Sequence, residues 1–223
     1  MKSLVRLCIG FVIIISSQKI VVAQYSLAVN SSTFTLDEQK FEGYSTSFEQ
    51  PFKEVKKEWW RYANSHSVIF NKKTHLVLTI PADKRESNSP LKFVSQFIEN
   101  KNGKTSVLRL ALMTDEIPED QVSDLKIQAR NLLKDFKVKY FTRKIQERIK
   151  NEEAESKKVS ITMDKYLLHN SRLQQWIERK PEEKDKFIEK LAANTKEVED
   201  LQKKLNNRQA ELTQLKHELT LIK

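Results

Sequence analysis

Cysteine and glycine are both scarce in this chain, and each shortage limits what the protein can be. The single cysteine, Cys8, lies near the N-terminus, so the rest of the chain has no disulfide, thiolate nucleophile or cysteine metal ligand. Only three of the 223 residues are glycine, and none follows Gly103. Because turns and helix ends use glycine for its freedom at positive φ, we expect long helices with few sharp reversals beyond that point.

Motifs for catalysis or phosphate binding are also missing. The sequence has no G-x-S-x-G elbow, no glycine-rich phosphate loop and no H-E-x-x-H pair. Its four histidines fall in separate predicted elements, and the acidic cluster around Pro118 is explained by the dipole of a helix start. We therefore predict no catalytic residue, no metal site and no cofactor. A hydrolase built on the predicted head, residues 41–150, is kept as the enzyme alternative.

The N-terminus has the pattern of a secretory signal peptide. Lys2 and Arg6 precede an apolar run from 7 to 15, and small or modest side chains lead up to Ala23. Residues 1–23 are thus predicted to be a signal peptide cut after Ala23. The alternative is a membrane anchor, but polar residues 16–19 interrupt the apolar run well short of the ~20 residues that a span needs.

A cleaved signal predicts a secreted protein, located in the periplasm or cell envelope. Secretion without disulfides is more typical of a bacterial envelope than of a eukaryotic extracellular module. Removing the signal takes away three basic residues and no acidic one, so the net charge falls from +10 to +7. Secretion argues against a nucleic-acid partner, and anionic envelope surfaces or acidic proteins become the expected targets of a basic patch.

Residues 41–150 have the pattern of a small α+β head, preceded by a polar linker over 24–40. Pro51 begins a predicted helix with an apolar stripe of Phe52, Val55, Trp59 and Tyr62. Short alternating segments predict an antiparallel sheet with strands at 41–48, 67–70, 75–80, 91–98 and 106–113.

The last two of these strands are expected to form a hairpin around Asn102-Gly103, a strong two-residue turn signal. With that turn, apolar residues meet on one face and polar residues on the other. The predicted pairs are Phe97 with Leu108, Ser95 with Leu110, Phe93 with Leu112, and Gln96 with Arg109.

Long helices follow Pro118. A wide apolar stripe from Val122 to Tyr140 is suited to covering the sheet, and a helical connector is expected over 151–181. Residues 182–223 carry a heptad seam and predict a coiled coil. Asn194 and Arg208 are polar exceptions in this seam, whose apolar members include Leu191, Val198, Leu201, Leu205, Leu212, Leu215, Leu219 and Ile222.

The sequence does not decide which helix packs against the seam. Opposite charges at Glu211 and Lys216, and at Glu218 and Lys223, would support a parallel homodimer, so self-association through the coiled coil is the favoured hypothesis. The alternative is an intrachain hairpin, in which residues 159–179 and 182–223 fold together around Pro181.

Two surfaces are candidates for contact with a partner. Trp60 lies about 100° around the helix from Trp59, where it either widens the buried stripe or stays exposed among lysines. The segment 134–150 carries seven basic and two acidic residues. It is either an ordinary solvated helix face or a site for an envelope protein or anionic surface, and its candidate residues are Lys137, Arg143, Lys144 and Arg148.

The layout resembles uncharacterised secreted proteins of Bacteroidota-type bacteria. The features that carry this resemblance are the signal peptide, the helix "KEVKKEWWRYA", the N-G hairpin and the charged tail "VEDLQKKLNNRQAELTQLKHEL". The resemblance implies no activity and no site residues. A basic periplasmic chain with long helices is also similar in architecture to the Skp-type holdase chaperones.

Together these features predict a non-enzymatic envelope protein that acts in protein association or scaffolding through its coiled coil. The alternative is a periplasmic holdase whose helical arms hold unfolded clients.

Overall fold

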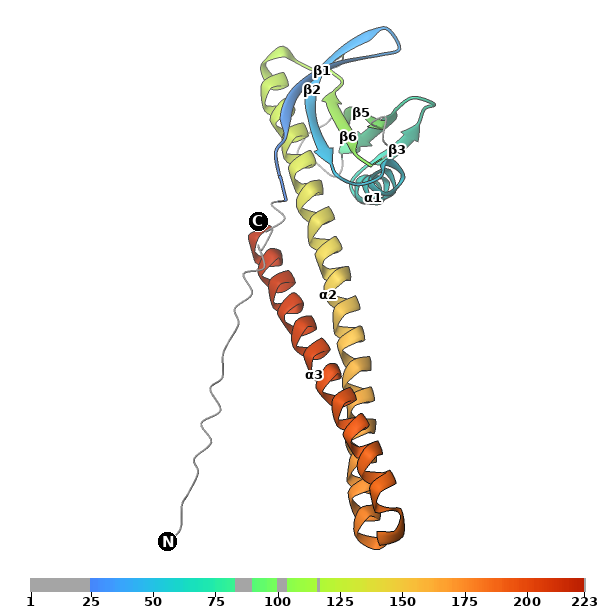
Figure 1. Ribbon diagram of the computed structural model, residues 1–223. Helices are drawn as coiled ribbons and strands as arrows, with labels where there is room; N and C mark the ends of the chain where they lie inside the picture. The colour runs from blue at the N-terminus through green and yellow to red at the C-terminus, as the bar shows by residue number, and fades with distance from the viewer. Residues whose placement is uncertain (1–24, 83–89, 100–103, 116, 223) are drawn as a thin grey trace, which may run out of the picture.

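The protein is an α+β chain with a six-stranded antiparallel sheet and three α-helices, two of them very long (Figure 1). The computed structural model describes residues 25–82, 90–99, 104–115 and 117–222. The strand order is β1-β2-β6-β5-β4-β3. The predicted signal peptide and the predicted Asn102-Gly103 turn lie outside the described residues.

Five of the six strands lie where the alternating pattern predicts them. They are β2 (Gln39–Phe48), β3 (Val68–Asn71), β4 (Leu76–Ile80), β5 (Leu91–Glu99) and β6 (Ser106–Leu112). The predicted register of β5 and β6 is confirmed, including Phe97 opposite Leu108 and Gln96 opposite Arg109. Side-chain alternation specifies this register because a slip by one residue would turn every apolar side chain to the wrong face.

The predicted linker over residues 24–40 is wrong, because most of it belongs to the sheet. Strand β1 (Asn30–Leu36) pairs with β2 through a two-residue turn at Asp37 and Glu38. Both turn residues have positive φ, 47° and 69°, which such tight hairpins require and which glycine usually supplies. The serines and threonines of β1 resemble a loop in composition, while Phe34 and Leu36 are buried. The head therefore extends over residues 25–150.

One face of the sheet is covered by α1 (Phe52–Asn64) and the first part of α2 (Glu119–Arg179). The predicted stripe on α1 is confirmed in its centre, where Val55 and Trp59 are fully buried. The Nε1–H of Trp59 donates a hydrogen bond to Ser95 on β5 at 3.2 Å. The stripe on α2 adds Leu125, Ala129, Leu133, Phe136 and Tyr140 to the same core.

Beyond the head, α2 continues as one side of a helical hairpin. With 61 residues and the usual rise of about 1.5 Å per residue, α2 is about 90 Å long. The chain then reverses at a short 3₁₀ turn, η2 (Pro181–Glu183), and returns as α3 (Lys184–Leu221) beside α2 (Figure 1). Pro181 is thus the first residue of a new turn, which leads the chain into the returning helix. We call residues 151–222 the arm.

The C-terminal end of α3 returns to the head and joins its core. Leu215 and Ile222 are buried in the same cluster as Phe141 and Ile145 of α2. Tyr25 packs against Phe141 with ring centroids 4.9 Å apart, and its hydroxyl donates to Glu218 at 3.2 Å. Burial and then the carboxylate of Glu218 raise the pKa of Tyr25. The arm is therefore fixed to the head through both of its helices, α2 and α3.

Candidate functional site

The heptad seam of α3 packs against α2 of the same chain. All the predicted seam positions are buried or half-buried, whereas most of their neighbours on α3 are exposed. The facing residues of α2 follow the same spacing of three and four, and include Val159, Met163, Tyr166, Leu173 and Ile177. The intrachain hairpin, one of the two arrangements open from sequence, is the one in the structure. Self-association stays a prediction, and the seam of α3 is not free to provide it because α2 covers the seam.

Polar seam residues have different environments. Arg208 donates to Glu152 on α2 at 2.6 Å, so this exception is matched by a carboxylate on the facing helix. Asn194 and Asn170 each keep one buried polar atom without a hydrogen-bond partner among the described residues. Such atoms cost stability, so packing around Asn170 and Asn194 contributes less than apolar residues at these positions would.

The predicted basic patch on α2 begins with Lys137, which is buried under the head. Only 1% of it is exposed, and its Nζ lies 5.3 Å from the Phe48 ring centroid and 6.0 Å from that of Phe141. The backbone oxygen of Ala28 accepts its hydrogen bond at 3.5 Å. Desolvation by burial lowers the pKa of Lys137 to about 8. Its ammonium group is thus closed off from any partner.

The other predicted basic residues form ion pairs within the chain. Arg143 binds Glu58 of α1 at 2.8 Å, Lys144 pairs with Glu54, and Arg148 lies 3.8 Å from Glu211 of α3. Burial alone would raise the pKa of Glu54, but hydrogen bonds from Lys144 and Tyr140 outweigh it and lower the pKa. These contacts hold α1, α2 and α3 together where the arm leaves the head.

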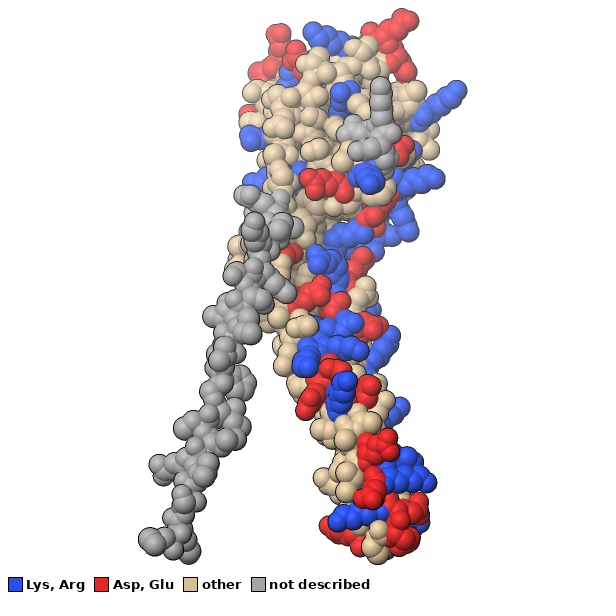
Figure 2. Space-filling model, in the orientation of Figure 1, with Lys and Arg blue, Asp and Glu red and all other residues tan. Residues whose placement is uncertain are grey.

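Charges of both signs alternate along the arm as well, as Figure 2 shows for one side. Lys216 pairs with Glu153 across the hairpin at 3.2 Å, and Lys158 pairs with Glu155 on α2 at 2.6 Å. Surface pairs of this kind each contribute little to stability. They nevertheless reduce the positive charge that these lysines can offer to another molecule.

Trp60 is 37% exposed, so it does not join the buried stripe of α1. Its neighbour Trp59 is fully buried, which separates the two tryptophans into a core residue and a surface residue. Single exposed apolar residues are common on protein surfaces, and Trp60 by itself does not form a patch.

A different exposed surface lies on α2, for most of its length on the side away from α3, while at its far end Trp176 reaches Phe187 of α3. At about 100° per residue, eleven side chains between positions 150 and 179 fall within an arc of about 100°. Three of them are Ala154, Gln175 and Lys158, the last of which pairs with Glu155. We call the other eight the arm face: Lys150, Lys157, Ile161, Lys165, Leu168, Arg172, Trp176 and Arg179. No acidic residue of this stretch of α2 falls in the arc. In the part of the chain that the structure describes, none of the five basic residues of the arm face has an ion-pair partner.

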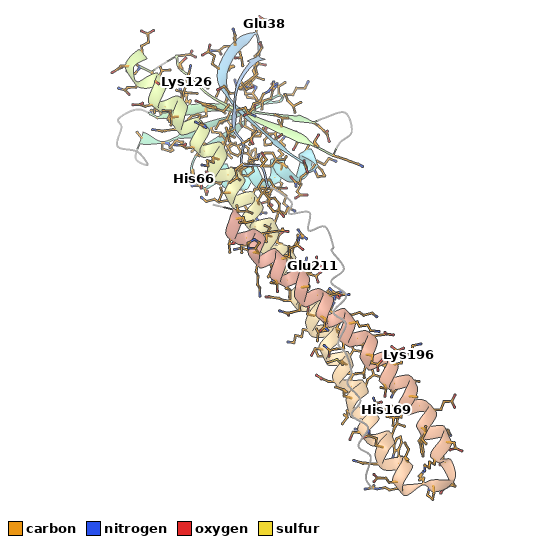
Figure 3. The ribbon with its side chains drawn as sticks, turned by 60° about the vertical axis from the view of Figure 1, so that its left-hand side comes forward. Glu38, His66, Lys126, His169, Lys196 and Glu211 are labelled. Carbon is orange, nitrogen blue, oxygen red and sulfur yellow. The ribbon has the colours of Figure 1, made fainter. Side chains whose placement is uncertain are left out.

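The apolar members of the arm face are strongly exposed for their type. Ile161 is 47% exposed and Leu168 is 56% exposed. Trp176 is 39% exposed, and its ring contacts Phe187 of α3 and His169. Figure 3 labels His169 in the far half of the arm. The sequence contained a signal for this surface, namely a second stripe of spacing three and four on the side of α2 opposite the heptad seam.

Two other kinds of site were sought in the described residues. They contain no group of three or more histidine, cysteine, aspartate or glutamate side chains arranged to hold a metal ion. Within the same residues, every helix is too short or too polar to cross a membrane. Comparisons with protein-family models, curated proteins and solved structures found no match.

Proposed function

We propose that this protein is a non-enzymatic association protein of the cell envelope, in which the arm face binds an acidic amphipathic helix of a partner protein. The head would hold the arm in a fixed direction. The observation that carries the proposal is the arm face itself, where unpaired Lys and Arg side chains flank Ile161 and Leu168 on a helix already packed on its other side.

The chemistry of the arm face favours a helical partner. Ile161 and Leu168 are one heptad apart, so a third helix could lay its own apolar seam along them, as in a three-helix bundle. Basic residues such as Lys165 and Arg172 would then flank that seam and prefer acidic residues at the edges of the partner. This arrangement keeps the expected role in association and moves the contact from the seam of α3 to the outside of α2.

The test is site-specific photo-crosslinking in the intact envelope. A photoreactive residue at Leu168 should give a single adduct, whereas one at Lys196, which lies in the far half of the arm on α3 (Figure 3), should not. Changing Lys165 and Arg172 to glutamate should abolish the adduct, because the acidic partner would be repelled. Equal adducts at both positions would contradict the proposal, and an adduct of twice the chain mass would identify a second copy as the partner instead.

A second candidate is the holdase, which the exposed apolar residues of the arm favour. Besides the arm face, Leu167 and Ile188 are 46% and 45% exposed. A holdase should suppress aggregation of an unfolded outer-membrane protein at stoichiometric ratio. Suppression by the wild type that is unaffected by Leu168→Glu would place client binding elsewhere on the arm.

A further inference from the structure

The head contains a polar hollow between the start of α1 and the turn that joins β3 and β4. Its volume is about 190 Å³, smaller than typical drug-sized pockets. The side chains of Phe52 and Phe97 form one wall and meet edge to face with ring centroids 5.9 Å apart. Lys56 from α1 and Lys72 and Lys73 from the turn line the other sides.

Lysines dominate the charge of this hollow, although the Asp37 carboxylate lies beside it, with its Oδ2 3.9 Å from the Nδ1 of His75. No carboxylate is among its lining residues, although three lysines are. Nor does any of these three ammonium groups form an ion pair within the described chain. The Nζ of Lys56 lies 5.5 Å from the Phe52 ring centroid, so it stays beside the aromatic wall. This differs from the junction between head and arm, where Arg143 and Lys144 are both neutralised by glutamates.

The floor of the hollow carries buried polar groups. Ser95, which is fully buried, accepts the Trp59 hydrogen bond through its Oγ. His75 is 8% exposed, and its Nδ1 lies 3.0 Å from Thr74 Oγ1. The Ser95 hydroxyl keeps one proton that it can donate. A buried hydroxyl donor beside ammonium groups favours a negatively charged ligand.

We infer that this hollow binds a small organic anion, a carboxylate or phosphate carried on a ring. The lysines would neutralise the anionic group, and the ring would pack against Phe52 and Phe97. A hollow of about 190 Å³ has room for a single ring with its anionic group and not for a larger ligand. This site goes beyond the proposed role of the arm and does not depend on it.

Calorimetric titration of the full chain at low salt tests the inference, with benzoate, phenyl phosphate and neutral benzyl alcohol as probes. At least one anion should bind and benzyl alcohol should not. Preference for benzoate or for phenyl phosphate identifies the anionic group. Lys56→Gln should weaken binding about tenfold, since one charge-assisted contact is worth about 1.5 kcal/mol. Lys57→Gln is the matched control, because Lys57 is exposed on the same helix but lies outside the hollow.

The double variant Lys72→Gln/Lys73→Gln gives a second, independent measurement on the turn between β3 and β4. Both side chains are exposed, so the variant should fold like the wild type and lose binding by more than tenfold. The inference is overturned if neither anion binds at millimolar concentration. It is equally overturned if benzyl alcohol binds as well as benzoate, or if Lys57→Gln weakens binding as much as Lys56→Gln.

Discussion

Replacing Lys137 with methionine should stabilise the protein at neutral pH, and the gain should shrink as the pH rises. Methionine keeps an unbranched side chain of similar length and removes the ammonium group. In the native protein that group is buried between Phe48 and Phe141, and its one hydrogen bond goes to the backbone oxygen of Ala28. No carboxylate of the described residues pairs with it.

The magnitude follows from the lowered pKa of Lys137. Burial lowers it from 10.5 to about 8, and one pKa unit corresponds to about 1.4 kcal/mol. Burying the charged form therefore costs about 3 kcal/mol. Losing the hydrogen bond to Ala28 takes back about 1 kcal/mol, so we expect a net gain of about 2 kcal/mol for Lys137→Met at pH 7.

The pH dependence has a definite sign. Because the pKa is lower in the folded state, the unfolded chain binds more protons between pH 8 and 10.5. The free energy of unfolding of the wild type should rise across that window relative to the variant. The penalty is fully present below pH 8 and is relieved as the pH rises through the folded pKa toward the unfolded one.

Urea unfolding at pH 7, 8.5 and 10, followed by circular dichroism, measures this difference. Subtracting the free energy of unfolding of the wild type from that of the variant at each pH cancels the titration of all other groups. Lys134→Met, an exposed position on the same helix, is the control and should change the free energy of unfolding by less than about 0.5 kcal/mol. The reasoning is refuted if Lys137→Met is less stable at pH 7, or if its gain stays constant up to pH 10.

Three further experiments test the packing. Gly43→Ala should cost about 2 kcal/mol by thermal unfolding, because its Cβ would lie 2.2 Å from the Leu110 oxygen; an unchanged melting temperature would contradict this close approach. Leu215→Ala should cost about 3 kcal/mol while head and arm still unfold together, and two separate transitions would disprove that the end of α3 belongs to the core of the head. A double-mutant cycle of Glu152→Ala and Arg208→Ala should give a coupling near 1 kcal/mol, and no coupling would show that the pair contributes nothing.

Deleting residues 182–223 would not be a clean test of self-association. The deletion would remove Leu215 and Ile222 from the core of the head, so the truncated chain would lose stability as well as any contact made by the arm. Sedimentation of the full chain, compared with Leu168→Glu, separates the two effects because Leu168 is exposed on the arm face. A second copy bound there would be lost in the variant, and the fold would be kept.

Local patterns in the sequence were enough to determine most of the elements. Alternation placed five strands and the register of the hairpin between β5 and β6, because a strand has only two faces and one of them is buried. The spacing of three and four identified the buried side of α1, both long helices and the seam of α3. Strand β1 was missed because its turn uses Asp37 and Glu38 at positive φ where glycine is usual.

Only the tertiary structure decided what each surface contacts. A heptad seam specifies an apolar complement of matching spacing, but it does not specify whether that complement lies on another chain or on α2. Likewise, the sequence shows that Arg143 belongs to a basic segment, but it does not show what Arg143 contacts. Its partner Glu58 lies 85 residues earlier and is brought to it by the packing of α1 on α2. Among the basic residues that folding leaves unpaired for another molecule are those on the arm face and around the hollow of the head.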